Sequence, residues 1–102
     1  MQHCHNEMPP ELLNHDQIKD YLKEIPGWDY SKENKKISRQ FSFKNYYETL
    51  AFINATAWVT HQENHHPYIT FGYNTCSIYF TTHSAAGVTL YDFICAAKID
   101  QL

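Results

Sequence analysis

The chain has 102 residues, of which 43% are hydrophobic and 16% aromatic, and its formal net charge is -3. This length and apolar content are typical of one folded domain and exclude a disordered protein. Proteins that bind nucleic acids concentrate positive charge on one face, and this chain has no basic cluster longer than Lys35-Lys36. We therefore expect no direct binding to DNA or RNA.

The N-terminal residues MQHCHNEMPPE lack the basic start and the apolar run of a signal peptide. No stretch approaches the roughly 18 consecutive apolar residues of a membrane-spanning helix. These features predict a cytoplasmic protein without a membrane segment. We expect residues 1–10, with the HCH tract at residues 3–5, to be a disordered N-terminal segment, and residues 11–102 to form a single domain.

The three cysteines, Cys4, Cys76 and Cys95, are odd in number and widely spaced, so they do not indicate a disulfide framework. This usage agrees with a cytoplasmic location. Cys76 and Cys95 lie in apolar surroundings, and we predict that both are core residues.

The first predicted element is an amphipathic helix that begins after Asn14, a suitable N-cap, and ends at Pro26-Gly27. Its apolar residues recur at spacings of four and three: Ile18, Leu22 and Ile25. Residues 28–31 and 36–43 follow as two short strands, separated by a turn-prone stretch at 32–34. One parity of the second strand carries Ile37, Arg39, Phe41 and Phe43. A β-hairpin is therefore predicted.

The next predicted element is a long helix over residues 46–61. Asn45 and Glu48 have the spacing of a capping box, and the stretch after them is largely apolar, without Gly or Pro. We expect this helix to be buried on more than one side. It should end before Pro67, because proline lacks a backbone donor and pushes His66 towards extended geometry.

Residues 68–74 and 75–82 are predicted to form a second hairpin with its turn near Asn74. Apolar residues alternate along both strands: Ile69, Phe71 and Tyr73, then Cys76, Ile78 and Phe80. Thr89 and Asp92 repeat the capping-box spacing, so a third helix should close the chain. This order predicts an α+β two-layer sandwich, in which three helices cover one face of a four-stranded antiparallel sheet.

Three of the seven histidines fall within residues 61–68, HQENHHPY. Imidazole has an ordinary pKa of about 6.5 and is also the commonest metal ligand, so the window offers proton transfer or metal binding. His65 and His66 precede the third strand, and His83 follows the fourth. Because hairpin partners begin and end at the same edge of a sheet, we expect these three rings to converge.

A metal site is one interpretation of these residues. His61 and His65 have the i, i+4 spacing of two ligands on a continued helix, and His83 could be a third. However, Gln62 occupies the place of the catalytic glutamate in an HExxH motif, so the match to ligand templates is loose.

A purely structural interpretation is economical for single residues. Asp92 would be a helix cap, His61 a cation at a helix C-terminus, and Tyr73 a core residue. This interpretation is weaker for the three converging rings, since they have no packing rationale and an unpaired histidine is costly to bury.

The spaced elements together resemble the pterin-4a-carbinolamine dehydratase family. They are HHP at residues 65–67, Tyr73, TTH ending at His83, AAGVT, and Asp92, with PGW at 26–28 and FSFKNYYETLAF at 41–52. The resemblance extends from about Leu12 to Asp100, and the family's fold is the one predicted above. The chain departs from the family at His61, where many members have an acidic residue. Some members also have an aromatic residue at the position of Ile69 and a cysteine at that of Ala85.

The resemblance implies dehydration of a 4a-hydroxytetrahydropterin to quinonoid dihydropterin, with no cofactor and no metal. His65 and His83 would act as acid and base, in roles that the sequence does not distinguish, while His66 would bind and orient the pterin. Asn64, Thr82 and Ser84 are neighbouring polar residues for substrate binding, and Pro67 would fix the loop.

The resemblance also implies partners. These are the pterin substrate, a functional link to an aromatic amino-acid hydroxylase, and assembly into a homodimer or homotetramer. An alternative function is that of a protein-binding module, as a dimerisation cofactor or transcriptional coactivator, which would use a helix or edge-strand surface instead of the histidines.

Overall fold

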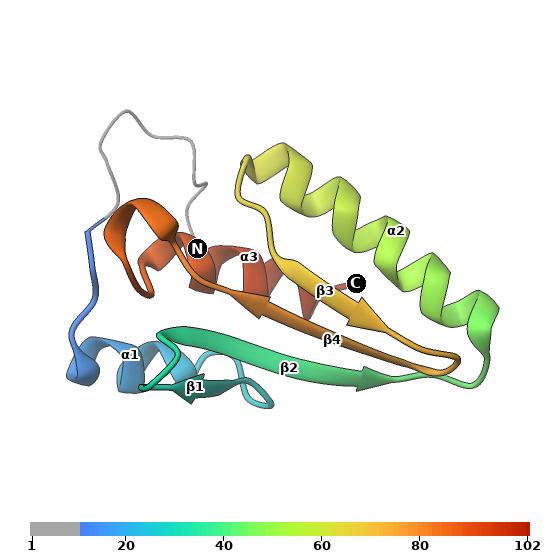
Figure 1. Cartoon of the computed structure of the whole chain (residues 1–102), viewed down its shortest axis with the longest axis horizontal. Helices are drawn as coiled ribbons and strands as arrows, with labels where there is room; N and C mark the ends of the chain where they lie inside the picture. Colours follow the sequence, from blue (N-terminus) through green and yellow to red (C-terminus); the bar gives the residue numbers. More distant parts are fainter. Residues whose placement is uncertain (1–10) are drawn as a thin grey trace.

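Figure 1 shows the computed structural model of the chain, in which residues 11–102 are described. Its elements are, in chain order, α1 (His15–Leu22), β1 (Asp29–Ser31), β2 (Lys36–Ser42), α2 (Tyr46–Glu63), β3 (Tyr68–Phe71), β4 (Thr75–Phe80), the short 3-10 helix η1 (His83–Ala85) and α3 (Leu90–Ile99). The predictions for the N-terminal segment, the HCH tract and Cys4 fall on residues 1–10, outside the described residues. Between residues 11 and 102, no helix has the length and hydropathy to cross a membrane.

The sheet has the strand order β1-β2-β4-β3, and every neighbouring pair is antiparallel. Both predicted hairpins, β1-β2 and β3-β4, are confirmed. They are joined by β2 and β4, where Ile37 lies opposite Phe80 and Phe41 lies opposite Cys76. The three helices lie on one face of this sheet (Figure 1), which confirms the predicted two-layer sandwich.

The core lies between the helices and the inner face of the sheet. Ile37, Ile78 and Phe80 from the two central strands are fully buried, and Phe93 and Ile94 of α3 belong to the same cluster. Burying a side chain of this size contributes roughly 1.5–3 kcal/mol, so the central strands and α3 form the best stabilised part of the fold. The predicted site residues lie at one end of this core.

Cys76 of β4 and Cys95 of α3 are buried in this core, as predicted. Burial raises the pKa of the Cys76 thiol, because removal from water penalises the charged thiolate. The thiol of Cys95 donates to the backbone carbonyl of His65 at 3.8 Å. This contact links α3 to the loop that follows α2.

Helix α1 begins as predicted but ends earlier. The side chain of Asn14 accepts from the N–H of Gln17, and the side chain of Gln17 accepts from the N–H of Asn14, which completes a capping box. Ile25 was expected on the apolar face of this helix, but it lies in the turn that follows and is still fully buried. The turn passes through Gly27, whose φ of 99° is available to glycine and rarely to other residues.

Helix α2 extends two residues further than predicted, and its expected burial on more than one side is wrong. Its buried residues are Thr49, Thr56, Thr60 and Glu63. Trp58, by contrast, is 64% exposed. Threonine can be buried in a helix when its hydroxyl has a partner, as in the bond from Thr60 Oγ1 to the carbonyl of Thr56 at 3.0 Å. Buried Glu63 pairs with Lys98 Nζ of α3 at 2.7 Å.

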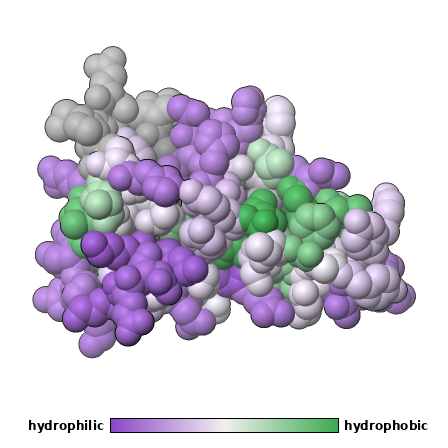
Figure 2. Space-filling model, viewed as in Figure 1, coloured by the Kyte–Doolittle hydropathy of each residue, from purple (hydrophilic) through white to green (hydrophobic). Residues whose placement is uncertain are grey.

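The predicted apolar face of strand β3 is only partly buried. Ile69 is half-buried, but Phe71 is 51% and Tyr73 66% exposed, so the interpretation of Tyr73 as a core residue is wrong. β3 is an edge strand, and residues 72–74 form the turn of the hairpin at its far end. Figure 2 shows hydrophobic side chains gathered along β3 and the adjoining part of α2.

Candidate functional site

A pocket of about 450 Å³ lies at the end of the sheet where β3 begins and β4 ends. This volume is typical of small-molecule sites, which span roughly 300–1,000 Å³. All seven predicted site residues line it: Asn64, His65, His66, Pro67, Thr82, His83 and Ser84. Tyr68 and Thr81 line it as well, although neither is among the predicted site residues. The structure therefore brings the three expected histidines to one pocket.

The end of α2 directs the HHP segment into this pocket. Asn64 caps the helix in the left-handed conformation, with φ 52°, which asparagine adopts more readily than most residues. The N–H of His65 then donates to the carbonyl of Thr60 at 3.2 Å. Pro67 has no backbone donor, so the helix cannot continue, and the chain enters β3 at the next residue.

His65 is the least exposed histidine of the site, with 12% of its side chain exposed. Its ring stacks on Phe80 at an interplanar angle of 10° and meets the ring of Tyr91 edge-on. Its Nε2 lies 2.5 Å from Oδ1 of Asp92, which is fully buried on α3. Because a carboxylate accepts hydrogen bonds, Nε2 carries the hydrogen, and Nδ1 is the ring nitrogen left for proton transfer.

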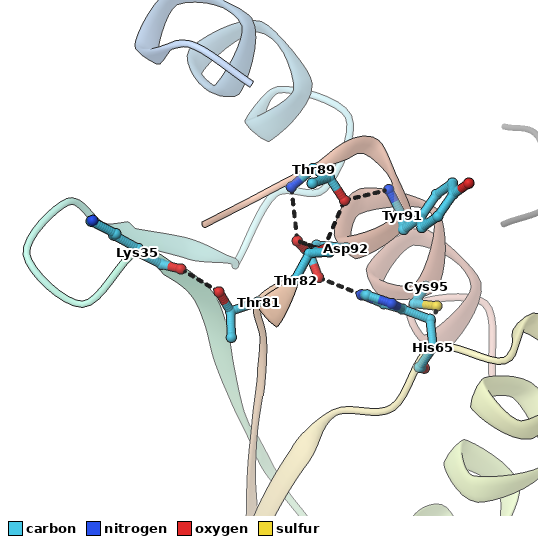
Figure 3. A network of polar contacts seen from close by, with 8 residues as sticks. All are labelled: Lys35, His65, Thr81, Thr82, Thr89, Tyr91, Asp92 and Cys95. Carbon is cyan, nitrogen blue, oxygen red and sulfur yellow. Dashed lines mark hydrogen bonds and ion pairs between the residues drawn. The ribbon is translucent and has the colours of Figure 1, made fainter. Parts of the chain in front are cut away.

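Asp92 is the centre of a buried polar network (Figure 3). Besides His65, its carboxylate accepts from the N–H of Thr89 at 2.8 Å and from the hydroxyl of Thr82 at 2.9 Å. The hydroxyl of Thr82 has one hydrogen, so the bond of 2.8 Å between the two threonine hydroxyls is donated by Thr89. Asp92 is thus the predicted helix cap and also a hydrogen-bond partner of His65, and its spacing from Thr89 predicted only the first of these roles.

His83 is exposed and is held differently. It opens the short helix η1 after β4, and its Nε2 lies 2.5 Å from the phenol oxygen of Tyr68 at the start of β3. The Tyr68 ring meets the His83 ring edge-on and stacks on Tyr79 of the neighbouring strand, with centroids 4.6 Å apart. His83 therefore contacts an aromatic side chain of the sheet surface.

The other predicted residues fill the wall between these two rings. His66 is exposed and, in addition to the pocket, lines a second hollow with Trp58 and His61. Asn64 and Ser84 are exposed at the pocket wall. The hydroxyl of Thr82 is already engaged with the Asp92 network, so its expected contact with a substrate stays a prediction.

The three ligands of the metal interpretation are not brought together as a cluster. Helix α2 ends at Glu63, so His61 and His65 do not share a helical face, and His61 does not line the pocket. Nε2 of His65 is directed at Asp92 instead. Within residues 11–102, no group of three His, Cys, Asp or Glu side chains is arranged to hold a metal ion.

Two of the family-pattern positions lie elsewhere than the site. Tyr73 is at the hairpin turn, at the opposite end of β3 from the pocket, where its carbonyl accepts from Thr49. His61, which replaces an acidic residue, is exposed in the last turn of α2. Tyr68 was not predicted as a site residue because it belongs to no motif. The available signal was its position directly after HHP, at the start of the strand that pairs with β4, where it lies opposite Tyr79.

Comparisons with known proteins agree with this geometry. Residues 11–102 match the family described as "Pterin 4 alpha carbinolamine dehydratase". The chain is 50% identical to a protein of Nitrosospira multiformis over 97% of this chain and 84% of the relative. It is also 50% identical to one of Legionella pneumophila over 98% and 90%. Both relatives are named provisionally as pterin-4-alpha-carbinolamine dehydratases.

Solved structures show the same fold. A "transcriptional coactivator/pterin dehydratase" from Brucella melitensis superimposes with a TM-score of 0.85 and 27% identity, over 89% of this chain and 97% of that one. A pterin dehydratase-like protein identified as a RuBisCO assembly factor in the alpha-carboxysome has a TM-score of 0.65 and 23% identity, over 76% and 90%. At that identity the second likeness concerns the fold alone. The match over residues 11–102 and the relatives at 50% identity show that the chain belongs to the pterin 4 alpha carbinolamine dehydratase family.

Proposed function

We propose that this protein dehydrates a 4a-hydroxytetrahydropterin to the quinonoid dihydropterin by acid–base catalysis with His65 and His83. The observation that carries the proposal is that His65, His66 and His83 line one pocket, where buried Asp92 contacts the ring of His65 and Tyr68 contacts the ring of His83. Family membership supports the substrate class. The product is the form that is recycled after aromatic amino-acid hydroxylation, so a hydroxylase is the proposed source of the substrate.

The chemistry requires one acid and one base. Loss of water from C4a proceeds when an acid protonates the departing hydroxyl and a base accepts the proton on N5, so that the nitrogen lone pair expels the leaving group. Two imidazoles near neutral pH can supply both steps, each contributing about 10²- to 10⁴-fold in rate. His66, exposed at the pocket rim, is proposed to bind the pterin ring, with Asn64 and Ser84 at its polar edges.

The direct test is turnover by the purified protein of carbinolamine generated by a hydroxylase. Dehydration should be faster than the spontaneous reaction, measured in parallel, and the double variant His65→Ala/His83→Ala should return it to the spontaneous rate. A double variant with unchanged turnover would show that these histidines are not the catalytic groups.

The proposed reaction needs neither metal nor cofactor. Exhaustive chelation should leave turnover unchanged, and elemental analysis should find no stoichiometric zinc. Activity that is lost on chelation and restored by one metal per chain would favour a metal mechanism instead.

We further propose self-association into a homodimer or homotetramer. The exposed face of α2 carries Tyr47 and Trp58, and β3 offers an unpaired strand edge beside it. Sedimentation at micromolar concentration should show an oligomer that Trp58→Ala weakens, and a stable monomer of the wild-type protein would contradict this proposal.

The same exposed face of α2 favours a second candidate function, binding to another protein. The Brucella melitensis neighbour is named as a coactivator as well as a dehydratase. A protein-binding role would survive the double histidine variant and be lost with Trp58→Ala, whereas dehydration would show the opposite pattern.

We also propose that the protein is cytoplasmic, which fractionation of the producing cells would test.

A further inference from the structure

We propose that Tyr68 is the positioning residue of His83, and that it sets which ring nitrogen of His83 carries the hydrogen. The inference rests on the proposed function, in which His83 transfers a proton. Tyr68 is not among the residues that carry the family resemblance, and it contacts the pocket from the first position of β3.

His83 has little else to hold it. It is exposed and lies in a helix of three residues, whereas His65 is enclosed by Phe80, Tyr91 and Asp92. An exposed imidazole samples several rotamers, and a proton-transfer group must be held near one geometry to act in the transition state. The contact of Nε2 with the Tyr68 phenol, at 2.5 Å, supplies that constraint.

Tyr68 is itself fixed by the sheet. It lies directly opposite Tyr79 in the β3-β4 register, and the two rings stack at an interplanar angle of 7°. The other strand neighbour contributes Lys36, whose Nζ lies 4.1 Å from the centroid of the Tyr79 ring. The row Lys36, Tyr79, Tyr68 and His83 therefore crosses three strands and ends on the catalytic ring.

A phenol suits a group that changes protonation state. When His83 is neutral, the Tyr68 O–H donates to Nε2, because a ring nitrogen is a better acceptor than a phenol oxygen, and the imidazole hydrogen then lies on Nδ1. When His83 is protonated, Nε2–H donates to the phenol oxygen. The hydroxyl can donate and accept, so the bond persists in both states, which a carboxylate or an ammonium partner would not allow equally.

The test uses Tyr68→Phe, which removes the hydroxyl and keeps the ring that stacks on Tyr79. The matched control is Tyr79→Phe, which removes a hydroxyl from the adjacent ring and leaves the Tyr68–His83 bond in place. The kcat of Tyr68→Phe should fall by about 3- to 10-fold, the effect of one neutral hydrogen bond, while Tyr79→Phe stays near wild type.

A second readout reports the ring directly. ¹⁵N spectra of the imidazoles at a pH where His83 is neutral should show its hydrogen on Nδ1 in the wild type and in Tyr79→Phe, and a shifted tautomer ratio in Tyr68→Phe. A merely structural tyrosine would not move this ratio. The same ratio in all three proteins, or a changed ratio with wild-type kcat in Tyr68→Phe, would overturn the proposal.

A double variant separates positioning from direct contact with the substrate. If Tyr68 acts through His83, adding Tyr68→Phe to His83→Ala should lower turnover no further. A further fall of the full 3- to 10-fold would instead make Tyr68 a substrate contact and contradict the proposal. If His83→Ala itself keeps wild-type turnover, the proposed function fails at His83, and the tautomer measurement still decides whether Tyr68 holds the ring.

Discussion

The two sides of the pocket hold the same residue type by opposite means. His65 is almost enclosed by the core, and its partner Asp92 is a fully buried carboxylate with two further donors. His83 is exposed on a short helix, and its partner Tyr68 is a surface phenol, 44% exposed. On one side the geometry proposed for proton transfer is built into the core, and on the other it rests on a single surface contact.

This difference implies that function and stability are coupled on the His65 side and separable on the His83 side. A buried donor or acceptor without its partner costs roughly 1–3 kcal/mol, because it has lost water and gained nothing in return. An exposed group that loses its partner is simply solvated. Variants on the two sides should therefore differ more in stability than in turnover.

The largest effect is expected from Asp92→Ala. The substitution leaves the N–H groups of Thr89 and His65 and the hydroxyl of Thr82 without their acceptor in a buried region. We expect the free energy of unfolding to fall by about 3 kcal/mol or more and turnover to be lost. Urea unfolding followed by fluorescence measures the first effect.

The matched control is Asp20→Ala, whose carboxylate is 78% exposed and pairs with Lys23 on the surface. It should change the stability by no more than about 0.5 kcal/mol. If Asp92→Ala does not fold, Asp92→Asn preserves the shape and tests turnover alone. Equal stability losses in the Asp92 and Asp20 variants would remove the distinction between the buried and exposed sides.

The comparison is most direct between His65→Ala and His83→Ala. Both should lower kcat by roughly 10²- to 10⁴-fold if each ring transfers a proton. His65→Ala should also cost about 1–2 kcal/mol of stability, because Asp92 loses a buried donor, whereas His83→Ala should be near neutral. Equal costs from thermal or urea unfolding would mean that His83 is held more firmly than its exposure indicates.

A smaller effect on turnover is expected from His66→Ala, because His66 lies at the rim shared by two hollows and is proposed to bind substrate. KM should rise by about tenfold or less while kcat stays near wild type, and stability should be unchanged. Steady-state kinetics corrected for spontaneous dehydration measures both constants. A fall in kcat as large as that of His83→Ala would make His66 a third proton-transfer group.

The smallest effect is expected in the core, away from both histidines, and concerns how the free energy of unfolding changes with pH when Cys76 is replaced. Burial raises the pKa of the Cys76 thiol, so the unfolded chain ionises first as the pH rises. The stability due to the neutral thiol is complete below the ordinary thiol pKa and is lost as the pH rises through the raised value. Above the ordinary thiol pKa of 9.0, the free energy of unfolding should fall less steeply with rising pH in Cys76→Ala than in the wild type. Parallel slopes would contradict this linkage.

Much of the fold was predictable because its signals are local. Caps at Asn14 and Thr89 place helix starts, and alternation along β2 and β4 places the strands. The prediction failed for α2, where apolar composition suggested burial on several sides. Which side of a helix is covered depends on its neighbours. Here the covered side carries three threonines, of which Thr49 and Thr60 donate their hydroxyls to carbonyls one turn earlier.

The sequence predicted which residues line the pocket, but not which side chains hold them in place. The seven proposed residues all line the pocket because the two strand ends of a hairpin must meet, which follows from antiparallel pairing alone. The sequence did not indicate that Asp92 contacts His65 or that Tyr68 contacts His83. Neither contact follows from a spacing within one helix or strand.

The sequence by itself determined the elements, the two hairpins and the family, because periodicity, caps and turn residues act over a few neighbouring positions. Only the tertiary structure decided the β1-β2-β4-β3 order, the side of α2 that is buried, and the partners of the two histidines. Those features depend on which distant segments pack together: His65 and Asp92 are 27 residues apart, and Tyr68 and His83 are 15 apart. Burial then makes one of these two contacts part of the core and leaves the other on the surface.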